Sequence, residues 1–169
     1  RAFCGFQAQP DGCSVQDALE RALAAIADAP VRVIGAGRTD AGVHATSQVV
    51  HFDATVERPL TAWVRGVNAA LPPAASVLWC VPVPDDFHAR FAATARHYTY
   101  VLLNRPERPG LLDGRVGWHF APLDVDAMRD GARLLVGTHD FSSFRAAACQ
   151  AKSPIKTLQV LDVARRGGF

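Results

Sequence analysis

The stretch Gly35-Ala36-Gly37-Arg38-Thr39-Asp40-Ala41-Gly42-Val43-His44-Ala45 organises the first half of this chain, because strand-like runs at residues 31–34 and 48–52 lead into it and out of it. Its small residues allow a tight backbone turn and the close approach of a bulky ligand. A guanidinium two residues before a carboxylate can keep that carboxylate ionised as a nucleophile or base. The same pair can also simply pin a hairpin turn. The stretch therefore indicates a reactive loop without identifying its substrate.

Two common phosphate-binding loops are excluded at this position. A dinucleotide-binding loop would place a third glycine after Gly35 and Gly37 and then open a helix, whereas Asp40 and a second strand follow here. The chain also has no Gly-Lys-Ser/Thr, so the loop is not a P-loop. A nucleotide-binding oxidoreductase is therefore disfavoured, and we expect no cofactor.

The composition bounds the class of protein. A chain of 169 residues with 49% hydrophobic residues can form one large domain or two small ones. It has no apolar run of about 18 residues, so we expect no membrane span. The four cysteines show no CxxC spacing, and the six histidines are scattered. They predict reduced thiols of a cytoplasmic protein, with neither a disulfide framework nor a metal site. A net charge of +2 is too small to establish a nucleic-acid partner.

The first half, residues 1–84, predicts the order β-α-β-β-α-β of a ferredoxin-like unit. Ser14 is a candidate N-cap with Asp17 as its capping-box partner, and the helix that follows ends at Pro30. A second helix is predicted over residues 60–71, before two prolines, and a strand over residues 76–83.

The second half, residues 85–169, predicts another α/β unit that begins β-α-β. Its expected strands cover residues 96–104 and 157–165, and its expected helix covers residues 123–136 with Asp124 as N-cap. The inward faces are expected to carry Tyr98, Tyr100 and Leu102 on the first strand and Val125, Met128, Ala132 and Leu135 on the helix.

Six strings resemble the TruA family of tRNA pseudouridine synthases, and they occur along essentially the whole chain in the same order as in that family. The central one is Gly37-Arg38-Thr39-Asp40-Ala41-Gly42-Val43-His44-Ala45. The others include Phe3-Cys4-Gly5-Phe6-Gln7-Ala8-Gln9 with Ser14-Val15-Gln16, Asn68 with Leu71-Pro72, Asp85-Asp86-Phe87-His88-Ala89-Arg90-Phe91, Ala93-Thr94-Ala95-Arg96-His97-Tyr98-Thr99-Tyr100, and Gly137-Thr138-His139-Asp140-Phe141-Ser142-Ser143-Phe144-Arg145 with Cys149-Gln150. The chain departs from the usual pattern at Ser47, where glycine is common, and at His97, where arginine is frequent.

The resemblance implies the pseudouridine synthase fold, an α/β (α+β) arrangement of two ferredoxin-like or RRM-like halves with mostly antiparallel sheets that meet at a central cleft. It implies isomerisation of uridine to pseudouridine on the 3′ side of the tRNA anticodon arm, by a homodimer that needs neither metal nor cofactor. It also implies that the working protein is longer at both ends.

The resemblance assigns three catalytic candidates. Asp40 matches the essential aspartate, which attacks the ring or the sugar or removes a sugar proton. Arg38 matches the residue that flips the uridine, although it could instead be structural. Tyr98 matches the tyrosine that contacts uracil, although a tyrosine on a strand can also be core, and Tyr100 is the stronger candidate for core. His44 is expected to pack the loop.

The resemblance and the need for cations against phosphate also give candidate tRNA contacts. They are Arg58, Phe87, His88, Ala89, Arg90, Phe91, Arg105, His119, Arg145, Ala148, Cys149, Gln150, Ala151 and Lys152. The alternative from another class is a non-catalytic RNA-binding module with ferredoxin-like halves. Such a module would have no need of Arg38 and Asp40 together.

Overall fold

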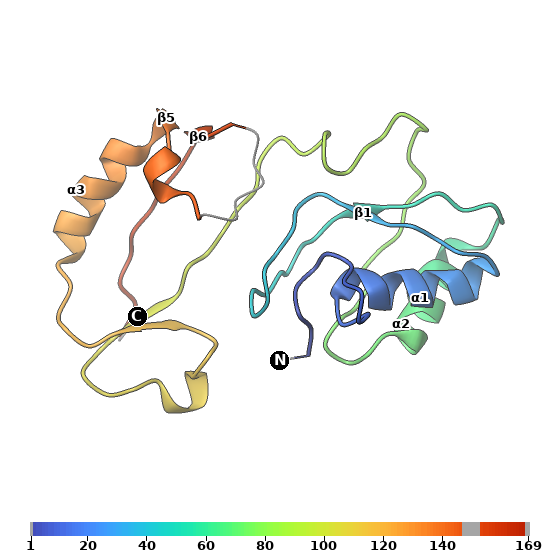
Figure 1. Cartoon of the computed structure of the whole chain (residues 1–169), viewed down its shortest axis with the longest axis horizontal. Helices are drawn as coiled ribbons and strands as arrows, with labels where there is room; N and C mark the ends of the chain where they lie inside the picture. The colour runs from blue at the N-terminus through green and yellow to red at the C-terminus, as the bar shows by residue number, and fades with distance from the viewer. Residues whose placement is uncertain (1, 147–152, 168–169) are drawn as a thin grey trace. The chain divides into compact units, whose positions relative to one another are not determined.

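A computed structural model describes residues 2–146 and 153–167 of the chain (Figure 1). The structure divides into two compact units, Arg1–Tyr98 and Thr99–Phe169. Both combine helices with short strand pairs, so the predicted mixed α/β class is confirmed. A division into domains at residues 84 and 85 remains a prediction.

The first unit combines a short hairpin with one α-helix and a second helical segment, in which a π-helical turn continues directly into an α-helix. Its strands β1 (Ile34–Gly35) and β2 (Val50–His51) pair antiparallel. Its helices are α1 (Val15–Ala27), the π-helical turn η1 (Ala62–Gly66) and α2 (Val67–Ala70). In Figure 1, α1 and α2 lie on the same side of the hairpin that carries the β1 label.

Helix α1 begins as the sequence predicts. The Ser14 hydroxyl accepts a hydrogen bond from the Asp17 amide at 3.0 Å, and the Asp17 carboxylate accepts one from the Ser14 amide at 3.1 Å. This reciprocal capping box satisfies backbone donors that the first helical turn leaves unpaired. The Ser14 hydroxyl also donates to that carboxylate, and this bond is the main cause that lowers the pKa of Asp17.

The core of the first unit lies between α1, η1 and α2. Its buried members are Leu19, Ala22, Leu23, Ala27, Val31, Val33, Trp63 and Val67. Gly66 allows η1 to lie close to α1, because a Cβ atom at position 66 would lie 2.6 Å from the Cδ1 of Ile26 on α1. Half-buried Val50 and Phe52 pack against the same cluster and attach the hairpin to it.

The predicted strand over residues 76–83 is not among the strands of the described structure. This segment is instead held by the Asn68 side chain, which donates to the Val77 carbonyl at 2.8 Å and accepts from the Val77 amide at 2.7 Å. A strand is defined by its ladder to a neighbour, which an alternating sequence does not itself supply. The predicted helix over residues 60–71 forms, but as the η1 turn followed by α2.

Two further strand pairs occur in the described part of the second unit. Strands β3 (Leu102–Asn104) and β4 (Gly117–His119) pair parallel, and β5 (Gly137–Asp140) and β6 (Ile155–Leu158) pair antiparallel. Helix α3 (Val125–Leu135) leads directly into β5 (Figure 1), and the short 3₁₀ turns are η2 (Gly110–Leu112) and η3 (Ser142–Phe144). As predicted, Asp124 caps α3, accepting from the amides of Asp126 and Ala127.

Several expectations about the second half were wrong. Tyr100 is 84% exposed and is not core, whereas Leu103, which the alternation placed on the opposite face, is 1% exposed. The ladder in this segment begins only at Leu102, so the residues before it are not held on a sheet face. On α3, Ala132 is buried as expected, but Met128 is 40% exposed. The last strand begins at Ile155 rather than residue 157 and ends at Leu158.

The expectation that all the cysteines are reduced was also wrong. Cys4 and Cys13 form a disulfide, because the turn between them brings their Cα atoms to 5.6 Å, a separation that disulfides normally span. Sequence spacing did not reveal this turn. Cys80 is a free thiol, and burial raises its pKa. Cys149 lies outside the described residues. Among those residues, no helix has both the length and the apolar character needed to cross a membrane.

Candidate active site

The loop between β1 and β2 is held at its base by both backbone and side-chain bonds. Ile34 pairs with His51 and Gly35 with Val50. Beyond the ladder, the Ala36 amide donates to the Val49 carbonyl at 2.8 Å. The hairpin therefore fixes where the loop begins and ends.

The Asp40 backbone is held by a second segment from the start of the chain. The Phe6 amide donates to the Thr39 carbonyl at 2.9 Å, and Gly5 forms an antiparallel bridge with Asp40. The Val43 amide then donates to the Asp40 carbonyl at 3.1 Å, which closes a turn at Asp40. The carboxylate thus projects from a backbone that is bonded on both sides.

Two glycines are required for this geometry. Gly42, the third residue of the Asp40 turn, has a φ of +89°, which favours glycine. Gly5 has a φ of +122°, and a Cβ atom there would lie 3.0 Å from the Thr39 carbonyl oxygen. Any side chain at Gly5 would therefore displace the segment that pairs with Asp40.

Arg96 binds the loop from a distant part of the chain. Its guanidinium donates to the Ala36 carbonyl oxygen from Nε at 3.2 Å and from a terminal nitrogen at 2.5 Å. That terminal nitrogen also donates to the Arg90 carbonyl oxygen at 3.3 Å. The Gln48 side chain supports the next position, because its Nε2 donates to the Gly37 carbonyl at 2.7 Å. Arg96 thus joins the loop to the segment that contains Arg90.

The segment 87–91 packs beside the strand that leaves the loop. The Ala89 amide donates to the His51 Nδ1 at 3.1 Å, and Ala89 is buried. The His51 ring lies 6.0 Å from the Phe87 ring and 4.8 Å from the His88 ring. The His88 and Phe91 rings stack at 4.2 Å, while Phe91 is 77% exposed. An accessible aromatic face and the exposed Arg90 therefore lie next to β2.

The three catalytic candidates are all accessible to a large ligand. Arg38 and Asp40 are exposed, and Tyr98 is 76% exposed. The exposure of Tyr98 contradicts a core role. Asp40 can act as a nucleophile or base, Arg38 can contact an anion or a displaced base, and Tyr98 can stack on a planar ring. His44, which we expected to pack the loop, is also exposed.

The remaining candidate contacts are distributed over both units. In the first unit, exposed Arg58 donates to the Ile26 carbonyl at 3.3 Å. In the second, exposed Arg105 donates to the Glu107 carbonyl at 3.3 Å, and half-buried His119 lies at the end of β4. Arg145 is exposed just after η3. Ala148, Cys149, Gln150, Ala151 and Lys152 lie outside the described residues.

Sequence reasoning missed the positions that support the loop. Arg96 was noticed only as part of a longer string, and His51 and Gly5 were not singled out. Each acts through a contact with a residue far away along the chain, 60 positions away for Arg96 and 38 for His51. The only local signal was the small residue at position 5, since glycine favours positive φ.

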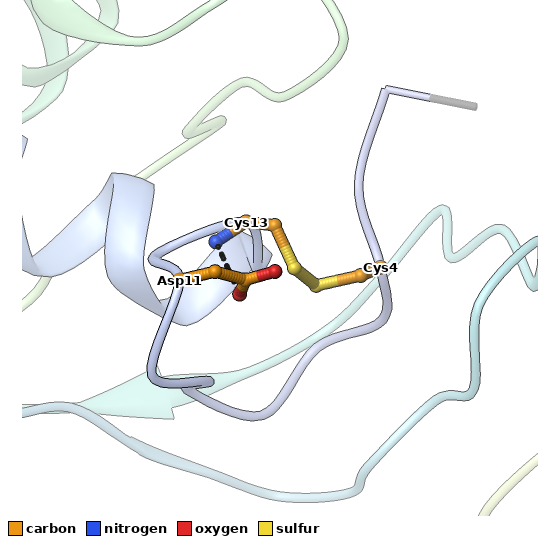
Figure 2. Close-up of side chains that lie close together, drawn as sticks. All are labelled: Cys4, Asp11 and Cys13. Atoms are coloured by element: carbon orange, nitrogen blue, oxygen red, sulfur yellow. Dashed lines mark hydrogen bonds between the residues drawn. A yellow bond between two sulfur atoms is a disulfide. The ribbon is translucent and has the colours of Figure 1, made fainter.

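One group of potential metal ligands occurs in the part of the chain that the structure describes. It consists of Cys4, Asp11 and Cys13, whose ligand atoms lie within 4.8 Å of one another (Figure 2). Both sulfur atoms are joined in the disulfide, and metals in proteins bind the thiolate form of cysteine. The oxidised pair therefore offers no thiolate ligands.

Comparison with known proteins gives a consistent result. A family profile described as tRNA pseudouridine synthase matches residues 1–92 and 132–168. A protein named tRNA pseudouridine synthase A from Dechloromonas aromatica is 60% identical over 167 residues, which are 99% of this chain and 64% of that protein. Proteins of the same name from Thiobacillus denitrificans and Nitrosomonas eutropha are 59% and 57% identical over 99% and 100% of this chain, and 64% and 61% of their own lengths. The chain therefore spans somewhat less than two thirds of these relatives.

Proposed function

The chain belongs to the tRNA pseudouridine synthase family, and we propose that the protein isomerises uridine to pseudouridine in tRNA. The observation that carries this proposal is the Arg38–Asp40 loop within the matched residues, held by a hairpin, by Gly5 and by Arg96. Support from three separate segments fixes the backbone at the loop, as the positioning of a reacting side chain requires. The relatives bear the name of an enzyme that performs this reaction.

The reaction requires little beyond one well-placed carboxylate. The C1′–N1 glycosidic bond breaks, the uracil rotates, and its C5 joins C1′; C5 loses its proton and N1 gains one, so the product is an isomer of the substrate. No electrons are exchanged and no group is lost, so we propose that neither a metal nor a cofactor takes part. Asp40 is the proposed catalytic residue, acting on the ring, on the sugar carbon or on a sugar proton. Its exposed carboxylate is accessible to a nucleotide brought to the loop.

A uridine in a stem must leave the base stack before it can react, at a cost of a few kcal/mol. We assign Arg38 to this step, because it is an exposed residue of the same loop, two residues before Asp40. Tyr98 is 76% exposed, which supports a role for its ring in stacking on the extruded uracil. In this proposal, Arg38 takes the place of the base in the stack and Tyr98 provides a surface for the extruded uracil.

The proposed tRNA surface includes the segment 87–91 with Arg90 and Phe91, and the exposed cations Arg58, Arg105 and Arg145. Arginines beside accessible aromatic rings suit phosphate contact and base stacking together. The substrate region we propose is the 3′ side of the anticodon arm, bound by a homodimer in the cytoplasm. His119 and residues 148–152 complete the proposed contacts.

Replacing Asp40 with asparagine in the full-length protein tests the assignment. Asp40→Asn preserves the size of the side chain and removes the charge, so turnover on tRNA should fall by at least about a thousandfold, roughly 4 kcal/mol of transition-state stabilisation. Binding of tRNA, which many phosphate contacts supply, should change less than about threefold. Pseudouridine is counted in the product tRNA under single-turnover conditions. Exposed Asp53 outside the loop offers the matched control Asp53→Asn, which should be unaffected.

The alternative is a non-catalytic RNA-binding module. Tight tRNA binding by the wild-type protein without any pseudouridine in the product would favour it. Activity that disappears on dialysis against EDTA and returns with zinc would instead contradict the metal-free chemistry.

A further inference from the structure

A disulfide closes the first turn of the described chain. Cys4 and Cys13 are joined across a loop that includes Asp11, and the Cys4 amide donates to the Cys13 carbonyl at 3.2 Å. Figure 2 shows the yellow sulfur bond between the starting segment and the residues just before α1. The cross-link therefore ties the start of the chain to the N-terminus of that helix.

The segment held by this disulfide is the one that pairs with the catalytic turn. Gly5, the residue after Cys4, bridges Asp40, and the Phe6 amide donates to the Thr39 carbonyl at 2.9 Å. Gly5 packs closely against the Thr39–Asp40 turn, since a Cβ atom on Gly5 would lie 3.0 Å from the Thr39 carbonyl oxygen. Displacement of Cys4 is thus transmitted to Asp40 through one residue.

The other edge of the same segment is bonded to α1. The Val15 amide donates to the Gly5 carbonyl at 3.1 Å, and the Gln16 amide donates to the Phe6 carbonyl at 2.9 Å. Gly5 and Phe6 therefore lie between the helix and the Thr39–Asp40 turn. The disulfide adds a covalent link at the Cys4 end of this arrangement, beside the backbone hydrogen bond from Cys4 to Cys13.

We propose that Cys4 and Cys13 form a reversible thiol–disulfide site whose oxidation state sets the order of the Asp40 turn. This regulatory effect rests on the proposed function, in which Asp40 is catalytic. Compartments that contain tRNA and glutathione keep most thiols reduced, and disulfides found there are commonly transient or redox-sensing. The oxidised state holds Gly5 against Asp40 and is the more active state. Reduction leaves the segment held by hydrogen bonds alone, which loosens it and slows turnover.

The exchange needs only a thiol or disulfide partner. In oxidation, one protein thiolate attacks a small-molecule disulfide such as glutathione disulfide and releases one thiol. The second protein thiolate attacks the mixed disulfide and releases the other, so that two protein thiols lose two protons and two electrons. In reduction, a dithiol reverses both steps and becomes a disulfide itself.

Asp11 tunes the rate of this exchange. Its carboxylate lies within 4.8 Å of both sulfur atoms, and it accepts from the Cys13 amide at 3.4 Å. A negative charge disfavours a neighbouring thiolate, which is the form that attacks a disulfide. Asp11→Asn should therefore speed oxidation of the reduced pair by roughly three- to tenfold at neutral pH.

The experiment compares oxidised and reduced full-length protein. Glutathione buffers of graded potential set the state, and alkylation followed by peptide mapping reports Cys4 and Cys13 separately. Hydrogen exchange is then measured on the peptide that spans residues 36–45, and single-turnover pseudouridine formation on tRNA. Reduction should deprotect that peptide, lower the midpoint of thermal unfolding by roughly 5–10 °C and slow turnover roughly three- to tenfold.

The double substitution Cys4→Ser with Cys13→Ser should reproduce the reduced state and remove all response to the buffer. Cys80→Ala is the matched control, because Cys80 is the free thiol of the first unit, and it should keep the full response. Equal exchange of the 36–45 peptide in both states, or failure of the pair to oxidise, overturns the proposal. Altered exchange with no pseudouridine in either state would support the redox site and instead reject the proposed function.

Discussion

The Arg96 guanidinium donates two hydrogen bonds to the Ala36 carbonyl oxygen, at 3.2 and 2.5 Å, across 60 positions of sequence. With its third bond to the Arg90 carbonyl, it joins the proposed catalytic loop to the segment that we propose for phosphate contact. In our assignment, Arg96 contacts neither the reacting atoms nor the tRNA. It is therefore a positioning residue.

Arg96→Ala should slow turnover about tenfold, equivalent to the roughly 1.4 kcal/mol of a net hydrogen bond to a charged group. Arg96→Lys should recover little, because an ammonium lacks the planar fork that reaches both carbonyls. Hydrogen exchange of the 36–45 peptide should rise in both variants, which a merely electrostatic role would not cause. Arg133→Ala, which removes an exposed arginine paired with Asp130 on α3, is the control. Unchanged exchange in Arg96→Ala would contradict the positioning role.

Tyr98 separates ring stacking from hydroxyl chemistry. Tyr98→Ala should weaken productive binding of uridine by roughly 1–3 kcal/mol, because it removes the stacking surface. Tyr98→Phe keeps the ring, so any loss of rate in that variant reports the hydroxyl. Tyr100 is 84% exposed and two residues away, so Tyr100→Ala is the matched control. A normal rate for Tyr98→Ala would show that the uracil binds elsewhere.

Arg90 should contribute to tRNA affinity through a phosphate. Each neutralised phosphate steepens the dependence of log affinity on log salt by about 0.7–0.9. Arg90→Ala should therefore weaken tRNA binding and reduce that slope by roughly one. The rate of pseudouridine formation on tRNA that is already bound should not change. The comparison is Arg32→Ala, since Arg32 pairs with Glu20 and its side chain is 85% exposed. Identical slopes for wild type and Arg90→Ala would remove Arg90 from the interface.

The capping box of α1 makes stability depend on pH. The Ser14 hydroxyl is the main cause of the lowered pKa of Asp17, whose usual value is 3.8. A carboxylate with a lowered pKa stabilises the fold above that usual value, and the contribution disappears as the pH falls through the lowered pKa. Asp17→Asn should therefore reduce the free energy of unfolding near neutral pH and have little effect in strong acid.

Urea unfolding of wild type and Asp17→Asn, at neutral pH and below the usual pKa of aspartate, measures the difference. Ser14→Ala should cost about 1 kcal/mol at neutral pH through the lost cap. Asp113→Asn, at an exposed position in the other unit, should show no such pH dependence. A stability difference for Asp17→Asn that persisted in strong acid would have another origin.

The local elements and the chemical candidates followed from sequence. Helix α1 with its Ser14 cap and helix α3 with its Asp124 cap depend on side chains a few positions apart. The hairpin around Asp40 joins two strand-like runs that follow one another in the sequence, so all three patterns can be recognised locally. The string from residue 37 to residue 45 identified the family before any contact was known, and the family profile agrees. Helix caps and turns are short-range interactions, which is why a single sequence is enough to recognise them.

Tertiary structure alone decided what supports the proposed catalytic loop. No periodicity shows that Arg96 reaches Ala36, that Gly5 meets Asp40, or that Cys4 and Cys13 come within bonding range. Nor did alternation reveal that Leu103 rather than Tyr100 is buried, because burial depends on which segment lies beside a strand. These contacts require the chain to return on itself, and their energies depend on distances that the order of residues does not contain.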